Sequence, residues 1–291
     1  MSGGSDRDAA AAADRTTQAR APRLRIALLT LESTASAAAV AAFARMQRER
    51  LVLVGLSDPY RRAAGGMFGQ VWRHLRRSGP RLLPWLALEF ALPRLLSACR
   101  LGGFGSLTAF CREAGVPVVT VEDVNGPRFH AALREARPDL IVTFHFDQIL
   151  RAETIALAPQ GGINVHPSLL PRHRGPMPAF WALQEEPPAL GVTVHRLVPR
   201  IDAGPILAQR PMPLPPGISV STAARALHAM GAALASEAVA MIEAGRAEEL
   251  AFDPLAYCPF PSPAALRRAA RRHRLRLVDA EDWRAAWRTR L

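Results

Sequence analysis

Residues 24–56 read LRIALLTLESTASAAAVAAFARMQRERLVLVGL and hold two apolar runs, at 24–31 and at 51–56, of the length and composition of buried strands. The alanine-rich residues 35–48 between them predict a helix. A strand, a helix and a strand at this spacing predict a βαβ unit, and therefore a parallel sheet that is covered on both faces.

The same alternation continues along the chain. Further strands are expected at residues 116–121, 140–144, 163–166, 191–197 and 209–214, and further helices at 105–114, 127–137, 177–185 and 220–244. The sequence thus predicts an α/β protein with a Rossmann-like, mostly parallel sheet in one domain over residues 23–258. Residues 1–22 are polar, alanine-rich and without periodicity, so we expect a disordered tail there.

Composition excludes several classes of protein. The chain has 291 residues, of which 49% are hydrophobic, enough to bury a core without disulfides or metal. Three scattered cysteines do not make a disulfide framework. The most apolar stretch, residues 82–96, contains two prolines, Glu89 and Arg94, so it does not predict a membrane span. The acidic N-terminal segment lacks an apolar core typical of an export signal, and we expect a cytoplasmic protein.

The formal net charge of +12 lies in two segments. Residues 61–100 contribute +7 and residues 261–291 contribute +6, whereas the rest of the chain sums to −1. The first segment interrupts the α/β alternation, and we interpret residues 61–101 as an arginine-rich helical insertion. Residues 259–291 are expected to form a basic C-terminal tail, either helical or loose. The arginines are interpreted as contacts to an anionic partner, or else as a solvated helical face or a dimer contact.

Common catalytic and nucleotide-binding motifs are missing from the sequence. It contains no G-x-x-x-x-G-K-[ST], H-E-x-x-H or G-x-S-x-G, and residues 102–105 (GGFG) do not complete a dinucleotide fingerprint. The most distinctive run is GINVHPSLLP at residues 162–171. Asn164 and His166 are two residues apart on the expected strand, so they share one face at its C-terminal end, where open α/β sheets bind ligands.

A carboxylate follows in the turn VPRIDAGP at residues 198–205. An amide, an imidazole and the carboxylate of Asp202 are suited to acyl transfer without a covalent intermediate. Asn164 and a protonated His166 would stabilise an oxyanion, and Asp202 would raise the pKa of His166 and accept a proton. On residue type alone, there is an alternative interpretation without catalysis. Asn164 and His166 would then be a buried hydrogen-bonded pair, and Asp202 would be a turn residue.

Three linked segments carry a resemblance: NVHPSLLPRHRG at 164–175, GVTVH at 191–195 and IDAGPI at 201–206. In this order they resemble the formyltetrahydrofolate-dependent formyltransferase family. That family includes glycinamide ribonucleotide formyltransferase, methionyl-tRNA formyltransferase, amino-sugar formyltransferases and formyltetrahydrofolate deformylase. The resemblance covers residues 105–258 and, in outline, 24–60.

This resemblance implies a formyltransferase-type fold and a site with three groups of residues. Catalysis would fall to Asn164, His166 and Asp202. The remaining residues would bind the donor (Phe144, Gln148, Ile149, Leu150, Val198, Arg200, Ile201) or the acceptor (Ser168, Arg174, His195), with Arg174 meeting a phosphate.

The implied activity is transfer of a formyl group from 10-formyltetrahydrofolate, as co-substrate and without a metal, to a primary amine. The expected acceptor is a small or carrier-bound metabolite, with an amino sugar favoured. Methionyl-tRNA is a disfavoured acceptor, because residues 261–291 are too few for the β-barrel of the tRNA branch. Two alternative functions stay open: a hydrolase that uses water as the acceptor, as in the deformylase, and a catalytically silent relative that only binds. A homodimer is also left open.

Overall fold

The computed structural model describes residues 23–58, 65–92, 95 and 106–288. These residues form a seven-stranded sheet with the strand order β3-β2-β1-β4-β5-β6-β7. Strands β1 to β5 pair in parallel, whereas β6 and β7 are antiparallel to their neighbours. The strands are β1 (Ile26–Leu31), β2 (Leu51–Ser57), β3 (Val118–Val121), β4 (Leu140–Phe144), β5 (Gly162–His166), β6 (Gly191–Arg196) and β7 (Ile206–Pro211). The predicted α/β class with a mostly parallel sheet is confirmed.

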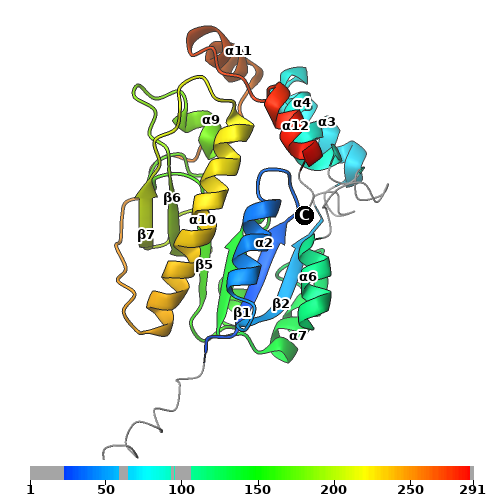
Figure 1. The fold of residues 1–291 in the computed structure, drawn as a ribbon, viewed down its shortest axis with the longest axis vertical. Helices are drawn as coiled ribbons and strands as arrows, with labels where there is room; N and C mark the ends of the chain where they lie inside the picture. The colour runs from blue at the N-terminus through cyan, green and yellow to red at the C-terminus, as the bar shows by residue number, and fades with distance from the viewer. Residues whose placement is uncertain (1–22, 59–64, 93–94, 96–105, 289–291) are drawn as a thin grey trace, which may run out of the picture.

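Helices cover both faces of the sheet (Figure 1). One face carries α2 (Ala37–Met46), α6 (Ser106–Ala114) and the long α10 (Val220–Glu243), and the other carries α7 (Pro127–Ala136) and the short α8 (Ala152–Ile155). A further short helix, α9 (Pro178–Ala182), precedes β6. Each of the helices expected at 35–48, 105–114, 127–137, 177–185 and 220–244 is present, with ends that differ by a few residues.

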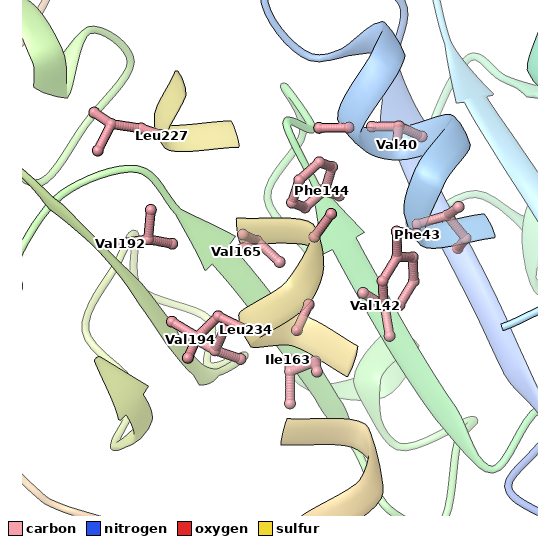
Figure 2. Packing of buried hydrophobic residues seen from close by; sticks show 14 of the residues in the cluster. Val40, Phe43, Val142, Phe144, Ile163, Val165, Val192, Val194, Leu227 and Leu234 are labelled. Carbon is pink, nitrogen blue, oxygen red and sulfur yellow. The ribbon is translucent and has the colours of Figure 1, made fainter. Parts of the chain in front are cut away.

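The core follows the alternation of side chains along the strands. Val142, Phe144 and Val165 point toward α2 and α10, where Phe144 stacks on Phe43 (Figure 2). The intervening residues, such as Ile141, point to the opposite face. α10 approaches the sheet closely at Gly231, where a Cβ would lie 2.8 Å from Val165 Cγ1.

The two arginine-rich segments both fold into helices. The described part of the insertion forms α3 (Gly66–Ser78), the 3-10 turn η2 (Pro80–Leu82), α4 (Leu83–Leu86) and the π-helical turn η3 (Ala87–Ala91). The C-terminal segment forms α11 (Pro263–Arg272) and α12 (Ala280–Arg288), beside α3 and α4 at one end of the molecule (Figure 1). A helical insertion was expected. For the C-terminal segment a helix or a loose tail was expected, and the segment is helical and packed, with Leu266 and Ala269 buried.

Two other expectations need comment. The last strand spans Ile206–Pro211 and not 209–214, because its buried half precedes the polar half. The tail expected at residues 1–22 lies outside the described residues. Among the described residues, none of the helices combines the length and the apolar character needed to cross a lipid bilayer.

Candidate functional site

A row of three polar side chains crosses the sheet at β4, β5 and β6. Asn164 of β5 pairs in register with Thr143 of β4 and with His195 of β6. Residues opposite one another on neighbouring strands point to the same face, which here is the face away from α10. The sheet itself thus brings Asn164 and His195 together, a contact that the sequence did not predict.

The hydrogen bonds in this row fix the orientation of the Asn164 amide. Thr143 Oγ1 donates to Asn164 Oδ1 at 2.7 Å, so the NH₂ group faces the other way. His195 Nδ1 donates to the Arg196 carbonyl at 2.8 Å, which leaves His195 Nε2 as an acceptor for Asn164 Nδ2 at 3.0 Å. The second amide hydrogen points toward Asp202 Oδ1 at 3.4 Å. This longer bond is the one that a ligand oxygen would most easily replace.

His166 lies at the end of β5, with its ring between a backbone carbonyl and Asp202. Its Nε2 donates to the His173 carbonyl at 3.2 Å, so Nδ1 is the lone-pair nitrogen in the neutral ring. Nδ1 lies 3.6 Å from Asp202 Oδ1. Two acceptors therefore face one another, and a proton between them is stabilised by both.

Asp202 is held by the segment that follows β5. Its backbone has φ of +45°, a left-handed conformation that costs free energy in residues other than glycine. The Gly175 N–H donates to Asp202 Oδ2 at 2.8 Å, and Arg174 binds the carbonyls of Ile201 and Asp202. The carboxylate of Asp202 is mostly buried, at 11% exposure.

Burial and neighbouring groups together set the protonation of this pair. Burial raises the pKa of the Asp202 carboxyl, but the opposing effects of His166, His195 and the Gly175 N–H are larger together, and the pKa falls to about 2. Burial also lowers the pKa of His166, and this effect exceeds the opposing effect of Asp202. We expected Asp202 to raise the pKa of His166; its pairwise effect has that sign, but the net shift is downward because the imidazole is buried.

The predicted donor-binding residues lie on both sides of β5. Phe144 is a core residue on the opposite face from Asn164, so only its backbone faces the edge of the sheet. The Gln148 side chain is tied inward to Ser57, Val121 and Val124. Leu150 is buried, whereas Ile149 is 52% exposed and its carbonyl accepts from Asn125 Nδ2 at 2.9 Å. Val198, Arg200 and Ile201 belong to the loop between β6 and β7.

The three predicted acceptor-binding residues are buried and are hydrogen bonded within the protein. Ser168 donates to the Arg172 carbonyl at 2.9 Å, and His195 orients Asn164 as described. Arg174 is 5% exposed and faces carbonyls. Contacts of these residues to an acceptor stay a prediction, while each has a structural partner that the sequence did not reveal.

Sequence reasoning missed two contributors. Thr143 sets the orientation of Asn164, and its signal was a single polar residue in the apolar run LIVTF. The half-buried His145 and the buried His228 lie with ring centroids 5.2 Å apart at the same end of the sheet. Burial lowers the pKa of His145 to about 4. The pKa of His228 is lowered to about 3, mainly by burial and to a smaller extent by the neighbouring His145.

Comparison with known proteins bears on this geometry. Residues 111–239, which include the whole site row and Asp202, match the family model described as "Formyl transferase". A segment of 118 residues is 43% identical to the methionyl-tRNA formyltransferase of Roseiflexus castenholzii. This segment is 40% of the present chain and spans 38% of that relative.

Solved structures agree with the fold. A glycinamide ribonucleotide transformylase from Symbiobacterium toebii superimposes with a TM-score of 0.54 at 22% identity, over 79% of this chain and 95% of that one. A sugar N-formyltransferase from a Shewanella species gives 0.52 at 15% identity, over 81% and 77%. At these identities the likeness concerns the fold alone. The family match over residues 111–239, which build the site, and this shared fold show that the chain is similar to formyl transferases.

Proposed function

We propose that this protein transfers the formyl group of 10-formyltetrahydrofolate to a primary amine. The observation that carries the proposal is the convergence of Asn164 Nδ2, His166 Nδ1 and Asp202 Oδ1, with separations of 3.4 and 3.6 Å around Asp202 Oδ1. One donor and two acceptors meet there on a preorganised framework. The match of residues 111–239 to the formyl transferase family model supports the identity of the transferred group.

Asn164 is proposed to stabilise the oxyanion. When the amine attacks the formyl carbon, a C–N bond forms and the carbonyl electron pair moves to oxygen. The amide hydrogen now directed to Asp202 is placed to donate to that oxygen. Thr143 and His195 hold the amide in this orientation before substrate arrives, so little reorganisation is needed during the reaction.

His166 and Asp202 are proposed to move the proton. The attacking nitrogen becomes positively charged in the tetrahedral intermediate and must lose a proton. His166 Nδ1 is a free acceptor in the neutral ring, and once protonated it is paired with Asp202 at 3.6 Å. The imidazolium also adds a positive charge near the oxyanion. Collapse breaks the bond to N10 of the folate, which takes up the proton, and the products are the formamide and tetrahydrofolate.

The folate donor is proposed to lie between residues 144–150 and the turn 198–201. Residues 144–150 follow β4, which pairs with β5, and the turn 198–201 leads directly to Asp202, whose Oδ1 lies 3.6 Å from His166 Nδ1. Gln148 and the Ile149 carbonyl are both held by hydrogen bonds to the protein, so the backbone of this segment is a fixed wall. The chemistry of a pterin ring, flat with several donors and acceptors, suits such backbone contacts.

An amino sugar is the acceptor that we propose first. Methionyl-tRNA is the second candidate, since the 43% identical relative is a methionyl-tRNA formyltransferase. Both acceptors present a primary amine to the formyl carbon, so the site chemistry is the same for each.

The test is a turnover assay that follows tetrahydrofolate release. The protein is incubated with 10-formyltetrahydrofolate alone, with nucleotide-linked amino sugars, and with methionyl-tRNA. Release that requires an amine supports the proposal, whereas release without amine indicates a hydrolase. No release with any acceptor, from protein that is folded by circular dichroism, would overturn the proposal and leave a silent relative. Glu248→Gln, an exposed substitution far from Asp202 in sequence, is the control and retains full activity.

A further inference from the structure

Arg174 is a buried arginine whose guanidinium faces neutral carbonyl groups. Its side chain is 5% exposed. Nε donates to the carbonyls of Ile201 at 3.1 Å and Asp202 at 3.0 Å. Nη2 donates to the Ile201 carbonyl and Nη1 to the Leu255 carbonyl at 2.6 Å. Burial of a charged group is costly unless its hydrogen bonds are satisfied, and here three of its nitrogens are.

Two of these carbonyls belong to the turn that presents the site carboxylate. Asp202 has a left-handed backbone, which is unfavourable for this residue without support from its surroundings. The planar guanidinium binds the carbonyls of Ile201 and Asp202 together, while the next residue, Gly175, binds Asp202 Oδ2 at 2.8 Å. Residues 174–175 thus hold both the backbone and the side chain of Asp202.

The same short segment also reaches His166. The His173 carbonyl accepts from His166 Nε2 at 3.2 Å. Three consecutive residues, 173–175, therefore fix the imidazole on one side and the carboxylate on the other. The separation of 3.6 Å between His166 Nδ1 and Asp202 Oδ1 is a consequence of these contacts.

We propose that Arg174 is a positioning residue, which sets the place of Asp202 relative to His166 and Asn164 and does not itself bind the acceptor. This inference rests on the proposed function where it concerns turnover. It replaces the role that the sequence favoured for Arg174, contact with an acceptor phosphate. A lysine would not hold the two carbonyls in the same way, because a single ammonium group lacks the planar fork of donors that binds both.

The experiment compares Arg174→Lys and Arg174→Ala with Arg172→Ala. Arg172 is a matched control, since its half-exposed side chain on the same segment pairs with Glu185 at 2.9 Å. We expect both Arg174 variants to lower kcat by about 100-fold, as is typical when a reacting group moves by about 1 Å. KM for both substrates should stay within about threefold, and guanidinium ion should partly restore Arg174→Ala. Arg172→Ala should behave as wild type.

A second readout does not need turnover. The imidazole of His166 is titrated by NMR in the wild type and in Arg174→Lys, which preserves the charge at this buried position. Because Asp202 raises the pKa of His166 at its present distance, that pKa should fall in the variant. If the wild type has no activity, the proposed function fails, but this titration still decides the role of Arg174.

Three results would overturn the proposal. An unchanged His166 titration in folded Arg174→Lys would show that Asp202 has not moved. Wild-type kinetics in both Arg174 variants would show that no positioning is needed. A large rise in KM for an anionic acceptor with unchanged kcat would identify Arg174 as an acceptor-binding residue.

Discussion

Replacement of Glu89 by glutamine should stabilise the protein much more at alkaline pH than at acidic pH. Glu89 lies in the π-helical turn η3 of the insertion and is 1% exposed. Its carboxylate accepts from the Ala35 N–H at 2.9 Å and from Ser221 Oγ at 3.1 Å. Burial raises the pKa of Glu89 to about 7 from an ordinary value of 4.5, and these two bonds offset only part of that effect.

The pKa shift sets both the sign and the size of the effect. Between about pH 4.5 and 7 the unfolded chain has released the proton of Glu89 while the folded protein still holds it. Folding stability is therefore fully present below pH 4.5 and is lost as the pH rises through 7. A shift of this size corresponds to about 3 kcal/mol above pH 8. The charges of Arg225 and Asp282 face Glu89 with opposite effects on its pKa, and Asp282 is itself paired with Arg225 at 2.7 Å.

Glutamine is the matched replacement because it keeps both contacts without a charge. Its carbonyl accepts from Ala35 and its NH₂ group donates to Ser221. We expect Glu89→Gln to exceed the wild type in free energy of unfolding by about 1 kcal/mol at pH 5 and by about 3 kcal/mol at pH 8. Urea unfolding followed by circular dichroism at both pH values measures this. Glu248→Gln, at an exposed position, should show no such difference. A gap that is the same at pH 5 and pH 8, or a variant that is less stable at pH 8, would refute the reasoning.

Three further outcomes follow from the site. Asn164→Ala should lower kcat by roughly 100- to 1,000-fold in the tetrahydrofolate release assay, with an unchanged circular dichroism spectrum, because it removes the proposed oxyanion donor. A loss below tenfold would contradict that role. His195→Ala should lower kcat without raising KM, since His195 Nε2 orients the amide from 3.0 Å, and a pure KM effect would instead favour acceptor binding. Gly204→Ala should lower Tm, because the added Cβ would clash with the Arg196 carbonyl oxygen, at an expected cost of about 1–3 kcal/mol in the free energy of unfolding. An unchanged Tm would show that the loop moves to accommodate the Cβ without a loss of stability.

The strands could be predicted because each is an apolar run with a sharp end. LIVTF at residues 140–144 coincides with β4, and LVLVGL at 51–56 lies within β2. The edge strand β7 was misplaced by three residues, since only its first half is buried and the rest is exposed. The α8 helix was missed because its four residues, 152–155, are too few to show a helical period.

The C-terminal segment was underestimated for a different reason. Its many arginines hide a regular pattern, in which Ala265, Leu266 and Ala269 are buried on one face of α11. A start signal was present, because Ser262 accepts a hydrogen bond from the Ala265 N–H and Pro263 opens the helix. The density of charge was therefore a weaker guide to the structure of this segment than the spacing of its apolar residues.

In the site, the sequence predicted which side chains meet but not how they are held. Asn164, His166 and Asp202 converge as expected. Their supports bind through backbone carbonyls, as Arg174 and His195 do. Carbonyl acceptors belong to every residue type, so no sequence pattern marks them, and such contacts emerge only from the fold.

The insertion and the C-terminal segment both converge on the first turn of α10. Asp282 of α12 accepts from Ser219 Oγ at 2.5 Å and from Thr222 Oγ1 at 2.7 Å, while Glu89 of the insertion accepts from Ser221. The same helix packs at Gly231 against Val165, which lies between the two site residues of β5. The arginine-rich segments are thus joined through buried acids to the helix that supports the strand of Asn164 and His166.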